Sequence, residues 1–201
     1  MIRSKNAVAA LFIAAIATVP AACASTSAGA AAADYSAVTS ETPALITEAD
    51  VIAAQNAWGS ALVSISRTYD EKGIDAATQL AGEVLDSAYG YQMGPVLFKP
   101  TLTVAPQTFR TTREGALAYF VGGNANYPND AGFALNGWDS YEIKNAGIFI
   151  DGDTAISMGN VMLTNKAGNV TTVDKTWGYL RDENGTLRII LHHSSLPYTA
   201  Q

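Results

Sequence analysis

Four segments in the last part of the chain have the composition of β-strands and follow one another through short connections. They are residues 138–150, 154–164, 170–181 and 186–196. Each connection is rich in the Gly, Asn and Asp residues that favour hairpin turns, as in Asp151-Gly152-Asp153. Because strands joined by such short turns pair antiparallel, these segments are predicted to form a meander. An antiparallel sheet buries at least one face, so the preceding residues are expected to cover it.

Two helical patterns begin the part of the chain before these strands. Thr47 and Asp50 have the spacing of a helix N-cap and its partner. Apolar residues then recur every three or four positions up to Ile65, which predicts a helix of about twenty residues. A second stretch with the same periodicity spans residues 74–89 and ends at Gly90.

The region between the second helix and the strands is less regular. Residues 95–110 mix β-branched residues with three prolines, which predicts an edge strand or an irregular strand. Thr111 stands three residues before Glu114, the spacing of a capping box, so a short third helix is expected there. Helices followed by a meander predict an α+β domain, in which a curved sheet wraps around the helices and leaves a cone-shaped interior open at one end.

The first 24 residues have the features of an export signal. Arg3 and Lys5 precede an apolar run over residues 7–19, which is too short to cross the ~30 Å core of a bilayer. Cys23, the only cysteine of the chain, stands where bacterial lipoprotein signals place the residue that is lipidated. Cleavage after Ala24 is the alternative, and it discards Cys23 with the signal. Both alternatives predict an exported protein, either periplasmic or anchored to a membrane by a lipid on Cys23.

Residues 25–46 consist mostly of Ala, Ser and Thr. Such a tract buries too little apolar surface to offset the entropy lost on ordering, so a flexible tether is predicted. The folded domain is then expected over residues 47–198.

The charge and the ligand content of the chain argue against two kinds of partner. Asp and Glu number 18 against 12 Lys and Arg, which gives a net charge of −6. No basic cluster is present to bind a phosphate backbone, so no nucleic acid partner is expected. With two histidines and one cysteine, a zinc site of three histidines cannot form within one chain, and any metal would need mostly carboxylate ligands.

The last predicted strand contains four polar residues in a row, His192-His193-Ser194-Ser195. The two-residue period of a strand places Ile190, His192 and Ser194 on one face, and Ile189, Leu191, His193 and Ser195 on the other. Polar groups that point into an apolar interior cost on the order of 1–3 kcal/mol each unless they are paired. One interpretation is that these groups pair with each other at a sheet edge, and the other is that they form a functional site.

This polar block and several separated motifs resemble the iota-class carbonic anhydrases. The motifs are His192-His193-Ser194-Ser195-Leu196-Pro197-Tyr198, Tyr89-Gly90-Tyr91, Gly94-Pro95-Val96-Leu97-Phe98-Lys99-Pro100-Thr101, Tyr119-Phe120-Val121-Gly122-Gly123, Met158-Gly159-Asn160 and Trp177-Gly178-Tyr179. The resemblance covers residues 48–198 and implies the cone-shaped, nuclear-transport-factor-2-like fold. That fold is similar to the association domain of calcium/calmodulin-dependent protein kinase II.

The resemblance implies the reversible hydration of carbon dioxide to bicarbonate. By motif, it implies that Thr101, Tyr119 and Ser194 act in the site, and His192 is added because it shares the strand face of Ser194. The hydroxyls would hold water and bicarbonate oxygens by hydrogen bonds between apolar walls. His192 or His193 would carry the proton outward. Without the resemblance, Thr101 is interpreted as a turn residue and Tyr119 as an aromatic residue of a helix face.

The sequence and the resemblance also lead to expectations about the cofactor, the oligomeric state and alternative functions. The family resembled has metal-using and metal-free members, and the residue count favours a metal-free site over one with zinc or manganese. A homodimer is also implied, and Trp177 and Tyr179 are expected on the outer face of the sheet, where a partner would cover them. Two alternatives remain on the same fold. One is an isomerase or hydrolase, which would need a carboxylate near His192, and the other is a non-catalytic oligomerisation or binding module.

Overall fold

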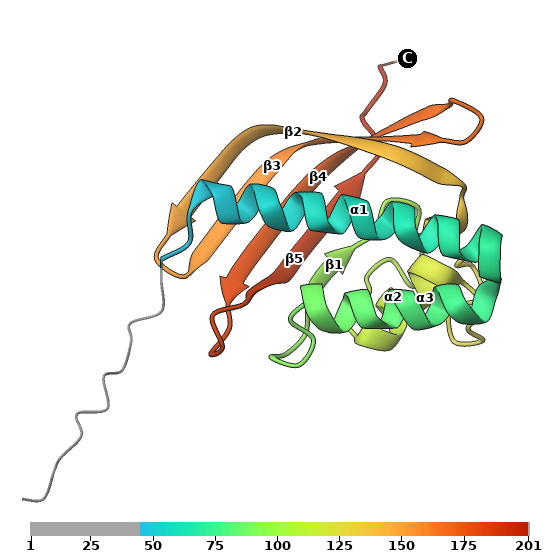
Figure 1. The fold of residues 1–201 in the computed structure, drawn as a ribbon, viewed down its shortest axis with the longest axis horizontal. Helices are drawn as coiled ribbons and strands as arrows, with labels where there is room; N and C mark the ends of the chain where they lie inside the picture. The colour runs from blue at the N-terminus through green and yellow to red at the C-terminus, as the bar shows by residue number, and fades with distance from the viewer. Residues whose placement is uncertain (1–44, 201) are drawn as a thin grey trace, which may run out of the picture. The chain divides into compact units, whose positions relative to one another are not determined.

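The computed structural model describes residues 45–200 (Figure 1). The predicted export signal at residues 1–24, with Cys23, and nearly all of the predicted tether lie outside the described residues. The described chain forms two helices, a short strand, a third helix, a 3-10 turn and four long strands. None of the helices within residues 45–200 combines the length and the apolar character needed to cross a membrane.

Helices α1 (Glu48–Lys72) and α2 (Ile74–Ala88) begin the domain. α1 starts at the predicted cap, where the Asp50 N–H donates to Thr47 Oγ1 at 3.2 Å and the Thr47 N–H donates to the Asp50 carboxylate at 2.9 Å. Gly73 joins the two helices with a φ of 84°, a conformation that favours glycine. Ile46 is buried and its N–H donates to the Gly152 carbonyl, so core contacts begin just before the cap.

Five strands form one sheet in the order β1-β5-β4-β3-β2. The predicted meander is present as the antiparallel strands β2 (Trp138–Asp151), β3 (Thr154–Asn165), β4 (Val170–Arg181) and β5 (Leu187–Ser195). The short strand β1 (Leu97–Lys99) lies at the sheet edge, as the prolines predicted, but it pairs parallel with β5. No hairpin joins β1 to β5, so nothing imposes antiparallel pairing there.

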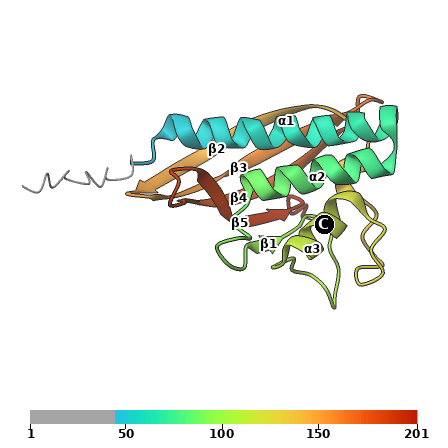
Figure 2. The same cartoon turned by 60° about the horizontal axis from the view of Figure 1, so that its bottom comes forward.

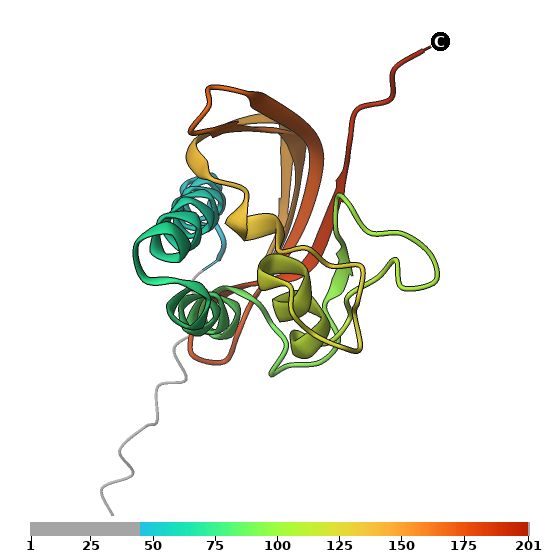
Figure 3. The same ribbon diagram turned by 90° about the vertical axis from the view of Figure 1, so that its right-hand side faces the viewer.

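The helices lie against the concave face of the curved sheet, as Figures 2 and 3 show. α1 packs on α2 and β2, and α2 packs on α3 (Arg113–Val121). The 3-10 turn η1 (Phe133–Leu135) contacts α1 and α3. The apolar residues between these layers form one core cluster. The α+β prediction, with a sheet curved around helices, is therefore confirmed.

The cap of α3 lies one residue later than predicted. Thr112 rather than Thr111 accepts a hydrogen bond from the Gly115 N–H at 3.2 Å. Glu114 is not a capping-box partner, because its carboxylate accepts hydrogen bonds from Asn124 and Asn126. Thr111 and Thr112 carry the same type of side chain. Thr112 is the cap because its backbone is extended and it directly precedes the first helical residue.

A β-bulge changes which residues of β5 face the helices. Gly178 pairs with Leu191 and Tyr179 pairs with Ile189, so Ile190 is the extra residue of the bulge. His192 and Ser194 face the core as predicted, but Ile189 joins them, where strict alternation predicted Ile190. An inserted residue reverses the alternation beyond it, and the sequence pattern does not contain that signal.

The expected position of Trp177 and Tyr179 is wrong. Both side chains are buried, with 2% and 0% exposure, and both belong to the core cluster. A period of two separates the faces of a strand but does not say which one is covered. Large aromatic side chains gain most from burial, and here the helices cover them.

Candidate active site

The register between β4 and β5 sets two pairs of side chains opposite each other on the concave face. Lys175 is paired with Ser194, and Trp177 is paired with His192. All four side chains are at most 3% exposed. Directly opposed residues of antiparallel strands have Cβ atoms about 4.5–5.5 Å apart. The last two strands therefore bring an amine, a hydroxyl and an imidazole together beneath the helices.

Thr101 joins this group from the other side of β5. The parallel pairing of β1 with β5 sets Lys99 opposite His193, and Thr101 follows two residues later. Its Oγ1 lies 2.6 Å from the Ser194 Oγ, a hydrogen bond in which either hydroxyl can donate. The Lys99 ammonium donates to the Ser194 carbonyl at 3.0 Å and ties the residues after β1 to the end of β5.

Tyr119 reaches the same place from α3. Its ring stacks on Phe133 and packs edge-on against Phe98, with ring centres 5.4 and 5.7 Å away. Its hydroxyl is buried and forms no hydrogen bond with any described residue. Burial raises the pKa of Tyr119, and the Thr101 hydroxyl and the backbone N–H groups of Thr101 and Leu102, which lie near the phenol oxygen, offset only part of this rise. The side chain is therefore a neutral phenol with a free O–H.

His192 belongs to a chain of buried hydrogen bonds. Its Nδ1 lies 2.9 Å from the Tyr89 hydroxyl, and the Trp58 Nε1–H donates to the same hydroxyl at 2.9 Å. Its Nε2 lies 2.8 Å from the Lys175 Nζ. Burial and the nearby Lys175 hold the pKa of His192 well below its usual value, so the imidazole is neutral. Phe98 stacks on the ring at a centroid distance of 4.4 Å.

Lys175 is the functional candidate that the sequence interpretation missed. Burial lowers its pKa to about 7. A signal for it existed in the strand pattern, because Val173, Lys175 and Trp177 alternate and all three are buried. Lys175 is thus a charged residue type on an apolar face. Tyr89 and Trp58 were also not predicted as site residues, because their roles depend on contacts between α1, the end of α2 and β5.

These side chains surround a tightly packed pocket that leaves essentially no space for a water-sized molecule. It is lined by Trp58, Phe98, Thr101, Tyr119, Phe120, Phe133, Lys175, His192 and Ser194. Water and carbon dioxide can therefore enter only when the lining side chains move apart. Polar groups from β4, β5, α3 and the residues after β1 meet in it, and aromatic rings form the remaining walls. The predicted residues Thr101, Tyr119, Ser194 and His192 are thus brought together, whereas His193 is exposed on the other face of β5.

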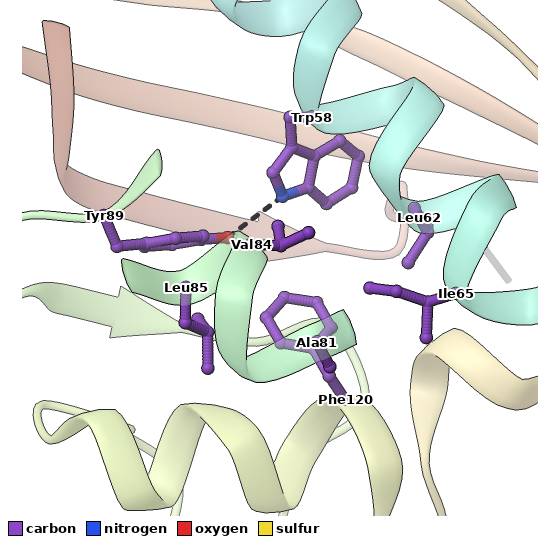
Figure 4. Close-up of a pocket in the computed structure, with 8 residues that line it drawn as sticks. All are labelled: Trp58, Leu62, Ile65, Ala81, Val84, Leu85, Tyr89 and Phe120. Carbon is purple, nitrogen blue, oxygen red and sulfur yellow. Dashed lines mark hydrogen bonds between the residues drawn. The ribbon is translucent and has the colours of Figure 1, made fainter. Parts of the chain in front are cut away.

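A second pocket adjoins the first and is almost wholly apolar (Figure 4). Its free volume is only about 10 Å³, and it lies between α1, α2 and α3. Trp58 and Phe120 line both pockets. The Trp58–Tyr89 hydrogen bond, drawn in Figure 4, is its main polar feature.

The pocket around Ser194 offers little to a metal ion and no carboxylate base. Among its lining residues the nitrogen donors are one imidazole, one amine and one indole, and none is Asp or Glu. Between residues 45 and 200, no three His, Cys, Asp or Glu side chains come close enough to share a metal. The carboxylate near His192 that an isomerase or hydrolase would need is thus missing from this lining.

The profile of the family described as metal-independent carbonic anhydrase matches residues 49–196. The metal-independent carbonic anhydrase of Nostoc sp. (strain PCC 7120 / SAG 25.82 / UTEX 2576) is 65% identical over 153 residues, which cover 76% of this chain and 75% of the relative.

Solved structures agree with this result. The iota-carbonic anhydrase of a cyanobacterium, solved in complex with bicarbonate, is 64% identical, with a TM-score of 0.77 over 78% of this chain and 95% of that one. A calcium/calmodulin-dependent protein kinase II association domain from Xanthomonas campestris is 23% identical, with a TM-score of 0.50 over 78% of this chain and 94% of that one, and supports the fold alone. On the family profile and the 65% identity, this chain belongs to the metal-independent carbonic anhydrases.

Proposed function

We propose that this protein catalyses the reversible hydration of carbon dioxide to bicarbonate in the pocket around Ser194. The observation that carries the proposal is the meeting of the Thr101–Ser194 hydroxyl pair and the free Tyr119 phenol in one buried pocket. Family membership and the bicarbonate bound to the cyanobacterial relative support it.

The three hydroxyls have complementary roles in this proposal. Thr101 and Ser194 share one hydrogen bond, so one of the two hydroxyls keeps a proton to donate to a ligand oxygen. Tyr119 donates its free O–H to a second oxygen, where negative charge develops as carbon dioxide becomes bicarbonate. Donors fixed in a dry, aromatic pocket interact more strongly with that charge than donors in water.

The site works without a metal ion in this proposal. The family is described as metal-independent, and the lining residues supply hydrogen-bond donors rather than a set of metal ligands. Zinc or manganese is the alternative that the sequence left open. Stopped-flow measurement of carbon dioxide hydration by the purified protein, with and without a metal chelator, tests both points. Activity that persists with the chelator is expected. Absence of hydration would refute the proposed function, and loss on chelation would refute its metal independence.

A homodimer is part of this proposal, but Trp177 and Tyr179 no longer support it because both are buried. Phe149, Ile156 and Met158 are 67%, 46% and 59% exposed and come from adjacent β2 and β3. Phe149 is paired with Ile156 in the register, so these residues form one apolar patch on the convex face. A second copy of the chain is the expected cover. Sedimentation analysis distinguishes a dimer from a monomer.

Export remains a proposal that rests on residues 1–24 alone. The basic start, the apolar run and Cys23 support a protein that is periplasmic or anchored to a membrane by a lipid on Cys23. Mass spectrometry of the mature N-terminus distinguishes these forms, because a lipidated protein begins at Cys23 and carries acyl chains. A mature N-terminus after Ala24 would support simple cleavage.

A further inference from the structure

Lys175 is buried without an ionic partner in the part of the chain that the structure describes. Its side chain is 3% exposed, and no carboxylate lies within salt-bridge distance of its Nζ. The Nζ instead lies 2.8 Å from His192 Nε2, and 4.5 and 5.5 Å from the ring centres of Trp58 and Trp177. A buried charge without a counter-ion is costly, so the neutral amine is favoured here.

The hydrogen bonds around Lys175 also indicate that its amine is neutral. The Trp58 indole can only donate, so the Tyr89 oxygen accepts from it, and the Tyr89 proton must go elsewhere. His192 Nδ1 is the atom placed to accept that proton. A neutral imidazole that accepts at Nδ1 carries its own hydrogen on Nε2. The Nε2–H then donates to the Lys175 Nζ, which can accept only with the lone pair of a neutral amine.

A charged Lys175 would leave the buried Tyr89 O–H without a hydrogen-bond acceptor. If Lys175 were an ammonium that donated to Nε2, the His192 hydrogen would sit on Nδ1 and donate to Tyr89. The Tyr89 oxygen would then accept twice, and its own buried O–H would have no acceptor. Such a group costs on the order of 1–3 kcal/mol. The other titratable groups that face the amine, His192 on β5 and Tyr119 on α3, are neutral and do not favour an ammonium.

We propose that the neutral amine of Lys175 is the base that takes a proton from the water that attacks carbon dioxide. Lys175 lines the same pocket as Ser194 and is paired with it in the register of β4 and β5, so its amine lies beside the place where the hydroxyls would hold the reactants. Its lone pair becomes available to the attacking water when the hydrogen bond from His192 Nε2–H is released. This proposal rests on the proposed function. It adds the proton acceptor that three hydroxyl groups do not supply.

The step balances without any other reactant. One O–H bond of water breaks, and its proton forms a new N–H bond on Lys175. The water oxygen forms a C–O bond to the carbon of carbon dioxide, and the electrons of one C=O π bond move to oxygen, which gives bicarbonate and an ammonium. The ammonium later returns its proton to solvent or buffer, and the amine is restored.

The surroundings make the charged form tolerable for the duration of a turnover. The Trp58 and Trp177 faces attract a cation, an interaction worth up to about 2 kcal/mol in a desolvated site. Charging removes the lone pair that accepts the His192 Nε2–H, so this hydrogen bond is lost. The hydrogen bond from His192 Nε2–H forms again when Lys175 loses its proton, and this favours the return to the neutral amine once bicarbonate leaves.

Nitrogen-15 NMR of the whole protein tests the charge state without an activity measurement. The Lys175 amine is expected to be neutral at pH 8.5, and His192 is expected to carry its hydrogen on Nε2. An ammonium at Lys175 at that pH, or a hydrogen on Nδ1 of His192, would overturn the proposal whether or not the protein hydrates carbon dioxide.

Kinetics of Lys175→Met test the catalytic role. This variant keeps the length of the side chain and removes the base, so kcat for hydration is expected to fall about 100-fold or more. Added imidazole or small amines are expected to restore part of the rate. Bicarbonate binding measured by carbon-13 NMR should change little, and the exposed control Lys144→Met should keep full activity.

Each kinetic outcome separates the two proposals. An inactive wild-type protein refutes the proposed function, whereas an active wild-type protein with a Lys175→Met variant within twofold of its rate refutes the role of Lys175 alone. Circular dichroism establishes whether the variant is folded. If it is not, the NMR measurement on the wild-type protein decides the proposal.

Discussion

At the scale of single residues, the proposed site depends on hydroxyl groups that keep an O–H free to donate to a ligand. Ser194 and Thr101 share a hydrogen bond, while Tyr119 has a buried O–H and no partner among the described residues. A folded protein gains no stability from a buried O–H group that has no partner. A ligand oxygen that accepts from it supplies the missing partner.

Removing the Ser194 hydroxyl should reduce activity far more than stability. Ser194→Ala is expected to lower kcat/KM for carbon dioxide hydration about 100-fold, since it removes a preorganised donor from the pocket. The matched control is Ser195→Ala, because Ser195 is the next residue and projects from the opposite face of β5. Stopped-flow assays of both variants check this, and equal effects would contradict the proposed site.

Tyr119→Phe is expected to lower activity without lowering stability, whereas most core substitutions lower stability. The ring contacts with Phe98 and Phe133 remain, and only a buried hydroxyl without a partner is lost. We expect hydration to fall about 100-fold and the free energy of unfolding to stay equal or rise by up to about 1 kcal/mol. Urea denaturation beside the activity assay measures both, and a large loss of stability would show that the hydroxyl is paired.

At the scale of elements, bulges decide which side chains reach the interior. Strands β2 and β3 shift register between Asn145 and Gly147, and there the Asn145 amide forms two hydrogen bonds with Gln55 of α1, each of 2.8 Å. On β3, Gly159 lies opposite this bulge. A Cβ at Gly159 would stand 2.0 Å from the Lys144 carbonyl oxygen, which is too close for any side chain.

Two glycines in the bulge region offer a matched pair. Gly159→Ala is expected to lower the free energy of unfolding by about 1–3 kcal/mol, because the backbone of β2 must move away. Gly147→Ala should have little effect, since a Cβ there meets nothing within 4 Å. Thermal or urea unfolding checks the difference, and equal stability of the two variants would show that β2 is not held at this distance.

At the scale of the whole molecule, the buried amine and imidazole link stability to pH. The folded pKa of Lys175 is lowered to about 7, and the pKa of His192 lies well below its usual value. The unfolded chain therefore binds more protons than the folded one from mildly acidic pH up to the usual pKa of lysine, about 10.4. Stability rises with pH wherever the unfolded state binds more protons.

The free energy of unfolding is thus expected to increase between about pH 5 and pH 9, with the part above pH 7 due to Lys175. Urea denaturation at a series of pH values measures this slope. Lys175→Met should flatten the rise above pH 7, whereas Lys144→Met, at an exposed site, should keep it. A slope above pH 7 that persists in Lys175→Met would assign it to another group.

The sequence alone determined the elements, because their signals are local. The Thr47–Asp50 cap, the apolar periodicity of α1 and α2 and the hairpin turns of the meander all act within a few residues, and they placed these elements correctly. The motifs around Thr101, Tyr119 and Ser194 also singled out residues that meet in one pocket.

Only the tertiary structure decided features that depend on a partner far away in the chain. The parallel pairing of β1, the bulge at Ile190 and the burial of Trp177 follow from which surfaces meet, and a two-residue period cannot say which face is covered. The same holds for Lys175. Its residue type predicts an exposed cation, and only the enclosure by β5, α1 and α3 makes it a buried amine, because the free energy of a charge depends on everything that surrounds it.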